Sequence, residues 1–232
     1  RSAVSSVVMQ DQPGHAGSDT LSLSELVELA HSRSPENRRR LLDGVLTLCR
    51  TQPDICASPV LGDIFMTLAR QAERDIRITL SQALGDADWA PPALIHILAL
   101  DDIEIARPVI AASPLLADAD LLRILVEATL EHQIEVARRP RLSPVVADAI
   151  IDQAEPAPLT ALAGNTSARL NDDAMRRLVE HSRRIAGLRS PLSRHPRLTE
   201  ALAAQLYEWV GQALREAIND RFKIEDARLA PA

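Results

Sequence analysis

The stretch that decides the fold lies between Asp102 and Leu206, and five of its segments carry the pattern. They read DIEIARPVIAASP (102–114), LLADADLLRILVE (115–127), IEVARRPRLSPVVADAI (134–150), LAGNTSARLNDDAMRRLVEHS (162–182) and SRHPRLTEALAAQL (193–206). Short apolar helical segments alternate here with corners that contain proline or small residues. Alternation of this kind at a near-constant period is typical of helical repeat proteins.

The corners recur at a spacing that helical solenoids share. Successive corners lie roughly 26 to 30 residues apart, and they begin at Ser113, Arg139, Asn165 and His195. Each is followed by a polar N-cap and an apolar helix, and Ala90-Pro91-Pro92 resembles an earlier copy. The helices between the copies are too short to be stable alone, so they need stacked neighbours to bury their apolar faces.

Composition agrees with an all-α fold. Hydrophobic residues make up 46% of the 232 residues and aromatic residues only 2%, so the core must consist of Leu, Ile, Val and Ala. With only 8 glycines there are few places for tight hairpin turns. These proportions favour helices over sheets.

The five segments quoted above resemble a bacterial family, typical of alphaproteobacteria, that is catalogued as domain of unknown function 2336. The likeness covers about residues 60 to 220 and rests on the order and spacing of the corners. Pro108 inside a helix adds a HEAT-like trait, because proline kinks the helix that contains it. The resemblance implies a right-handed HEAT-like superhelix of about 10–12 helices and no particular activity. Members of the family often continue beyond this region, so a fragment or a short member is expected.

Local signals divide the chain into four parts. We expect a flexible tail at 1–19, N-terminal helices capping the array at 20–72, HEAT-like repeats with a C-terminal capping helix at 73–222, and a tail at 223–232. Ser22 with Glu25 forms a possible capping box, and Ser58-Pro59 starts a helical pattern that breaks near 71–75.

The final helix, predicted from about Thr199 to Phe222, has two interpretations. Apolar residues recur along it at near-heptad spacing, at Leu202, Leu206, Val210, Leu214 and Ile218. The helix therefore either closes the array or forms a homodimer seam. Polar residues that supply an outer face favour closure, namely Gln205, Glu208, Gln212, Arg215 and Glu216.

Catalytic, metal-binding and cofactor-binding patterns are missing from the sequence. Neither a Gly-x-Ser-x-Gly elbow nor a glycine-rich phosphate loop occurs, and no two of the six histidines have the i, i+4 spacing of helical zinc sites. Paired aspartates sit at helix starts, where they cap free N–H groups. Cys49 and Cys56 are interpreted as two reduced, mostly buried thiols. We therefore expect no enzyme activity, no metal and no cofactor.

One segment carries a marked excess of positive charge. Between residues 169 and 197, eight arginines face three carboxylates, Asp172, Asp173 and Glu180, so five positive charges remain. If they share a face, they form a candidate surface for carboxylates or phosphates of a partner. The arginines of this candidate surface are Arg169, Arg176, Arg177, Arg183, Arg184, Arg189, Arg194 and Arg197.

These features favour a cytoplasmic scaffold or adaptor that binds another protein. No apolar run approaches the roughly 18 residues of a membrane span. A nucleic-acid-binding protein that uses the basic segment is the first alternative, although the net charge of −6 argues against it. A HEAT-like protein with a cofactor pocket near His96 or His132 is the second. Trp89 and Trp209 are interpreted as packing residues rather than stacking platforms for bases.

Overall fold

In the computed structural model, which describes residues 20–229, all regular secondary structure is helical and the helices are joined by turns and short loops. The side chains of Arg215, Ala217 and 221–229 are outside that description, as are the predicted tail at 1–19 and the last three residues of the predicted tail at 223–232. The helices are α1 (Leu23–Ala30), α2 (Pro35–Thr51), η1 (Pro53–Ile55), α3 (Pro59–Gln71), α4 (Arg74–Leu84), α5 (Pro92–Ala99), α6 (Ile103–Ala112), α7 (Asp118–Glu127), α8 (Leu130–Ala137), α9 (Pro144–Gln153), α10 (Pro156–Gly164), α11 (Asp172–His181), η2 (Ala186–Leu188), α12 (Arg189–Ser193) and α13 (Glu200–Leu229). The all-α prediction is confirmed for these residues.

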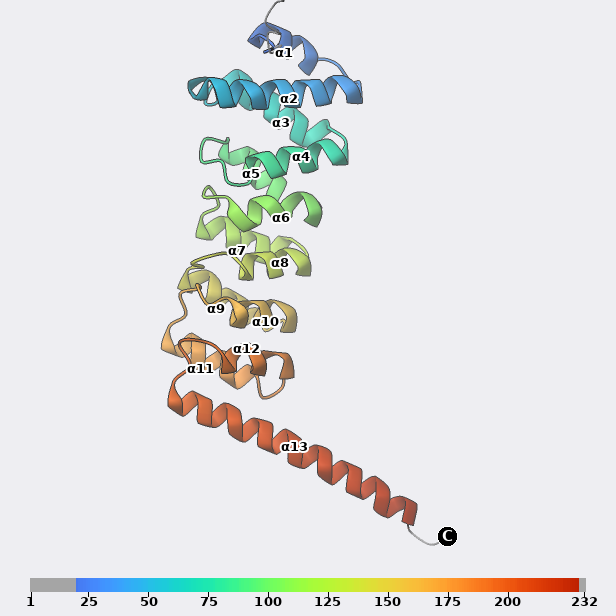
Figure 1. Cartoon of the computed structure of the whole chain (residues 1–232), viewed down its shortest axis with the longest axis vertical. Coiled ribbons are helices and arrows are strands. Elements are labelled where there is room, and N and C mark those ends of the chain that lie inside the picture. Colours follow the sequence, from blue (N-terminus) through green and yellow to red (C-terminus); the bar gives the residue numbers. More distant parts are fainter. Residues whose placement is uncertain (1–19, 230–232) are drawn as a thin grey trace, which may run out of the picture.

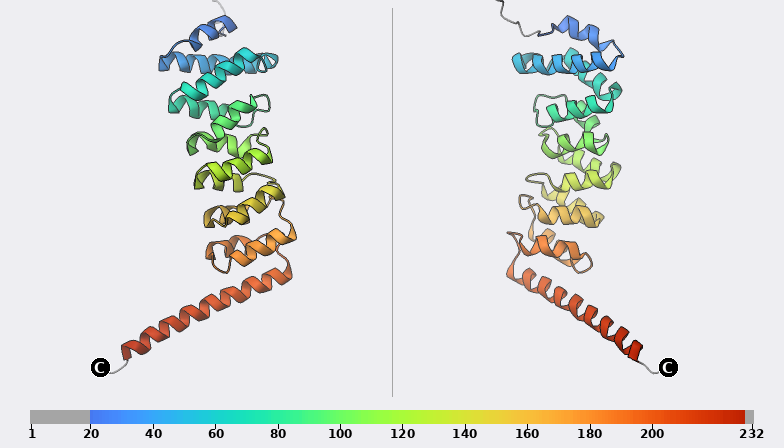
Figure 2. Two further views of the ribbon diagram at one scale, coloured as in Figure 1. Left: turned by 180° about the vertical axis from the view of Figure 1, so that it is seen from behind. Right: turned by 45° about the vertical axis from the view of Figure 1, so that its right-hand side comes forward.

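The helices stack in two layers along one long axis (Figure 1). In the layer of even-numbered helices, each helix from α2 to α10 contacts the next one of the layer, ending with α12. In the odd-numbered layer, α3 contacts α5, and α7 is followed by α9, α11 and α13. Consecutive helices also pair across the layers, as α5 does with α6 and α7 with α8. Figure 2 shows the same elongated stack from two other directions.

Apolar side chains between the layers form one continuous core. Leu94 and Ile95 of α5 and Ile105 and Val109 of α6 all belong to this core and are fully buried, and the two helices are in contact. Because each helix buries only the stripe that faces the other layer and its neighbours, its outer face stays in contact with solvent. The outer faces of both layers therefore remain exposed to solvent.

The period seen in the sequence appears directly as hydrogen bonds between corners. The Arg139 guanidinium donates to the Ser113 carbonyl at 3.1 Å, and Asn165 Nδ2 donates to the carbonyl of Arg139 at 2.7 Å. Each bond spans 26 residues. At the next corner, His195 accepts a bond on Nδ1 from the Arg197 N–H, while its buried Nε2 has no hydrogen-bond partner among the described residues.

Several local predictions are confirmed. Ser22 and Glu25 form the capping box of α1, with both reciprocal hydrogen bonds present. The Ser58 hydroxyl caps α3, which ends at Gln71, and α4 begins at Arg74, so the predicted break lies where expected. Thirteen α-helices are found among residues 20–229 instead of the 10–12 expected, partly because α12, of only five residues, is too short to produce a periodic signal.

The last helix differs most from its prediction. It continues to Leu229 instead of ending at Phe222, so most of the predicted tail is helical. Its first turns cap the array through buried Leu206 and through contacts with α11 and α12. Further along, Leu214 is 61% exposed and Ile218 43%. Figure 1 shows why: the helix leaves the stack at an angle, so no other described element covers its second half.

Candidate functional site

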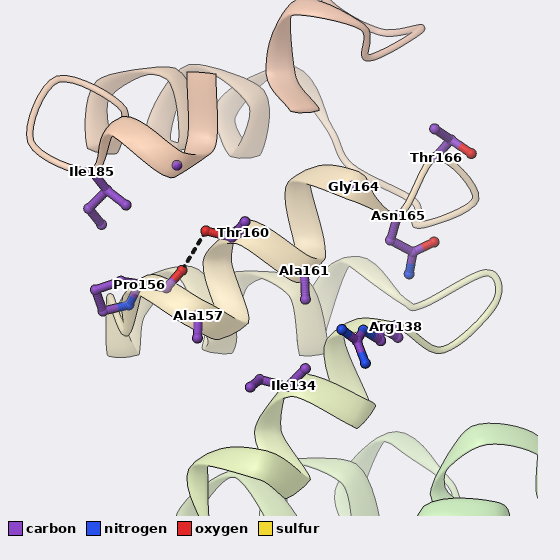
Figure 3. A pocket seen from close by; sticks show the side chains of 11 residues that line it. Ile134, Arg138, Pro156, Ala157, Thr160, Ala161, Gly164, Asn165, Thr166 and Ile185 are labelled. Atoms are coloured by element: carbon purple, nitrogen blue, oxygen red, sulfur yellow. Dashed lines mark hydrogen bonds between the residues drawn. The ribbon is translucent and has the colours of Figure 1, made fainter. Parts of the chain in front are cut away.

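The candidate site is a hollow of about 880 Å³ on the outer face of the even layer, centred on α10. Figure 3 shows side chains of α8 facing those of α10, with the loop after α11 closing the other side. The lining residues are Ile134, Arg138, Pro156, Ala157, Thr160, Ala161, Gly164, Asn165, Thr166, Ile185 and Gly187. We call this hollow the α10 groove.

The sequence of α10 explains why a groove forms there. The helix reads PAPLTALAG and contains no charged residue. Its large side chains, such as Leu159 and Leu162, are fully buried in the core, whereas the outward positions carry only small residues. The Thr160 hydroxyl donates to the Pro156 carbonyl at 2.8 Å, so its hydrogen-bonding capacity is met within the helix (Figure 3). The floor of the groove is therefore shallow and apolar.

The helices of the even layer before α10 are joined to one another by ion pairs. Arg38 before the middle of α2 meets Glu73 at 2.8 Å, Arg77 of α4 meets Asp101 at 3.0 Å, and Arg107 of α6 meets Glu135 of α8 at 3.1 Å. In each pair the arginine belongs to one helix, and the carboxylate belongs to the next even helix or to the turn before it. We call this series the ion-pair ladder.

The ladder stops at the α10 groove. Arg138, directly after α8, has no carboxylate on α10 to meet; its one carboxylate contact in the described region is with Glu135, at 3.4 Å, and Glu135 also holds Arg107. The Arg138 side chain is 63% exposed. A guanidinium thus lies at the edge of an apolar surface with only a shared partner from its own helix.

The eight arginines of the candidate surface are not gathered into one patch. Arg169 precedes α11, and Arg183 and Arg184 follow it. At 1.5 Å per residue, a helix of this length separates them by about 15 Å. Arg194 and Arg197 are exposed at the following corner, which lies on the Arg169 side of the stack. Because the corners and the loop after α11 lie at opposite ends of the helices, these residues form two groups.

Several of the eight are also engaged in internal contacts. Arg176 pairs with Asp173 at 2.9 Å and with Glu180 at 3.2 Å, and Arg177 pairs with Asp152 of α9. The Arg189 Nε donates to the Ser182 carbonyl at 2.9 Å. The group that stays together is Arg177, Arg183 and Arg184, which line a smaller hollow of about 370 Å³ with Glu180 and His181.

The histidines considered for a cofactor pocket have structural contacts instead. His132 is buried, with Nδ1 2.7 Å from the Thr129 hydroxyl and Nε2 2.8 Å from the Asp101 carbonyl, so it joins α8 to the turn before α6. His96 lies 3.2 Å from Asp120. Neither of the two lines the α10 groove.

The two thiols lie in the core at the end of α2. Both cysteines are free and buried, and the Cys56 thiol donates to the Cys49 carbonyl at 3.4 Å. Burial raises the pKa of the Cys49 thiol to about 12, so the thiol stays protonated and unreactive at neutral pH.

Within residues 20–229 no group of three or more His, Cys, Asp or Glu side chains is placed to hold a metal ion. In the same range no helix has the length and apolar character needed to cross a membrane.

Sequence reasoning missed the α10 groove. The available signal was the absence of charge from 156 to 164 together with small residues at Ala157, Ala161 and Gly164. These residues share one helix face because they are four and three positions apart. Only the arrangement of α8 and of the loop after α11 shows that this face is open.

Comparison with known proteins places the chain in a family. A family model described as "Uncharacterised protein conserved in bacteria (DUF2336)" matches residues 105–232, from α6 to the end. Searches of curated proteins and of solved structures returned no match. The matched region is more than half of the 232 residues and contains the corners and α10. The chain therefore belongs to this bacterial family, DUF2336.

Proposed function

We propose that this chain is a non-catalytic scaffold that binds another protein, built as a right-handed HEAT-like superhelix. The two-layer stack and the hydrogen bonds that link corners 26 residues apart support a solenoid architecture. In such arrays each repeat contacts only its neighbours, so long outer faces remain free for partners. A fold of this kind says nothing about function by itself, and the proposal rests on a site.

The observation that carries the proposal is the α10 groove. Along most of the even layer, neighbouring helices are joined by the ion-pair ladder, whereas α10 presents an apolar face with one guanidinium at its edge. The cores of protein interfaces are depleted in charged residues and enriched in apolar side chains and arginine. The composition of the groove therefore fits a protein partner better than it fits the polyanionic backbone of a nucleic acid, which requires several cations.

The exposed half of α13 extends the proposal to self-association. Tyr207 is 81% exposed, and Val210, Leu214 and Ile218 continue an apolar stripe beyond the part of the helix that packs on the array. A helix without tertiary contacts is marginally stable in water. Pairing of two copies along this stripe would bury its apolar side chains. The proposed homodimer interface therefore lies along this stripe of α13.

Affinity capture with matched variants tests the scaffold function. The tagged chain, Ala161→Glu and the control Ala83→Glu are incubated with lysate of a bacterium that encodes the chain and washed at moderate salt. Ala161 lies in the groove, whereas Ala83 is an exposed alanine near the end of α4 in the same layer. We expect a stoichiometric protein partner with the wild type and the control, and its loss with Ala161→Glu. Retention by Ala161→Glu, or recovery of nucleic acid in place of protein, would contradict the proposal.

A further inference from the structure

We propose that the α10 groove receives a protein segment that presents a carboxylate between apolar side chains, and that Arg138 binds this carboxylate. The inference rests on the proposed scaffold function and specifies the chemistry of the partner at the same site. It follows from three features of the groove: the interrupted ladder, the apolar lining and the single cation.

The ion-pair ladder does not continue from α8 to α10, because neither a residue of α10 nor its N-cap Glu155 forms an ion pair with Arg138 in the described region. Glu135 of α8 receives Arg107 of the preceding even helix. The corner hydrogen bond from Asn165 to Arg139 sets the local repeat at 26 residues, so the position equivalent to Glu135 is Ala161. In Figure 3, Ala161 points from α10 toward the α8 side of the groove, where Arg138 lies. Ala161 thus occupies the α10 position that matches Glu135 of α8, and it leaves the Arg138 guanidinium beside an apolar surface.

The lining determines what accompanies the carboxylate. Ile134 and Ile185, on opposite sides of α10, are both partly buried and offer apolar walls, and the alanines between them leave space (Figure 3). Apolar side chains of a partner bury area there and exclude water from the guanidinium edge. The pair of parallel N–H···O bonds between a guanidinium and a carboxylate is stronger, and its geometry better defined, when water is excluded.

The single cation distinguishes this ligand from a phosphate or a nucleic acid. Of the eleven residues that line the groove, Arg138 is the charged one. A phosphate with two charges needs several donors, and duplex binding needs a row of cations along the backbone. One guanidinium beside an apolar floor matches one carboxylate in an otherwise apolar segment.

Peptide selection tests the chemistry directly. A phage library of short random peptides is panned on the full chain and counter-selected on Ala161→Glu, and binding of the enriched peptides is measured by fluorescence anisotropy. We expect these peptides to share Asp or Glu flanked by apolar residues. Arg138→Gln should weaken binding roughly tenfold or more, as loss of a charge-assisted pair in an interface does. Replacing the acid of the peptide by its amide should weaken binding equally, and the two changes together should cost little more than either alone.

The matched control is Arg74→Gln, because Arg74 of α4 is also about half exposed in this layer but pairs with Glu104 of α6 and shares no partner with Arg138. It should leave peptide binding unchanged. If no peptide binds the wild-type chain more tightly than it binds Ala161→Glu, the groove is not a docking site and the proposed function fails with it. If Ala161→Glu blocks binding while Arg138→Gln changes it less than about twofold, the scaffold stands and the carboxylate inference is overturned. Enrichment of peptides without an acid would also overturn it.

Discussion

Replacing Gly85 by alanine should destabilise the array, although helix propensity alone favours the change. Gly85 directly follows α4 with ordinary right-handed helical angles, φ −54° and ψ −41°, so alanine fits its backbone conformation. On propensity and unfolded-state entropy, Gly→Ala in such a conformation stabilises by about 0.5–1 kcal/mol. The surroundings oppose this gain, because α4 and α6 approach each other closely at this point.

The size of the opposing effect follows from one distance. A Cβ atom at position 85 would lie 2.9 Å from the Pro108 carbonyl oxygen of α6, whereas ordinary van der Waals contacts begin near 3.4 Å. That oxygen belongs to the backbone of a buried contact, so the helices must separate to make room. Overpacking of this kind costs about 1–3 kcal/mol, which exceeds the gain from propensity. We expect a net loss of up to about 2.5 kcal/mol, centred on about 1 kcal/mol, and, for a chain of this size, a Tm lowered by about 2–4 °C for each kcal/mol lost.

The assay is urea unfolding and thermal melting followed by circular dichroism, with Trp fluorescence as a second probe of cooperativity. Gly164→Ala is the matched control, because nothing lies within 4 Å of a Cβ built at that position of α10. The control should be neutral or slightly stabilising. If Gly85→Ala proves as stable as the wild type, the close approach of α4 to Pro108 is not a constraint and the reasoning is refuted.

Three further predictions concern other parts of the chain. Burial and the nearby Arg197 charge lower the pKa of His195 below its ordinary value of 6.5. The fold therefore favours the neutral ring, and stability should fall as the pH drops through 6.5. Urea titrations across this range should show a smaller fall in His195→Asn, and equal pH dependence in both proteins would contradict this account. Asn165→Ala removes two side-chain donors from the carbonyls of Ala137 and Arg139, so it should lower the free energy of unfolding by about 1–3 kcal/mol; no change in denaturation midpoint would show that the corner bonds are dispensable. Leu214→Glu places a charge in the exposed stripe of α13 and should shift the wild-type sedimentation coefficient from dimer to monomer, whereas a wild type that is already monomeric would exclude the seam.

Features that depend on neighbouring residues could be predicted from the sequence. The capping box of Ser22, the break between α3 and α4 and the corner period all arise from side chains within a few residues of each other, or from a motif repeated along the chain. The all-α class could also be predicted, because a core of Leu, Ile, Val and Ala with few glycines favours helices over sheets.

The arginines show where this reasoning ends. Closeness in sequence suggested one basic surface from Arg169 to Arg197, yet α11 separates Arg169 from Arg183 and Arg184. Arg177 meets Asp152 of the preceding helix in its layer, 25 residues earlier. Which arginines are neutralised depends on how the repeats stack. Which residues of neighbouring repeats lie close together cannot be read from the sequence.

By itself, the sequence determined that this protein is a chain of short helices with a repeated corner, because helix spacing, capping and turn chemistry are local. The tertiary structure decided which faces stay open: α10 is a groove because α8 and the loop after α11 border it without covering it, and the stripe of α13 is exposed because the stack ends before it. An apolar stripe has the same pattern in sequence whether or not a neighbour buries it. Only the three-dimensional packing tells the two apart.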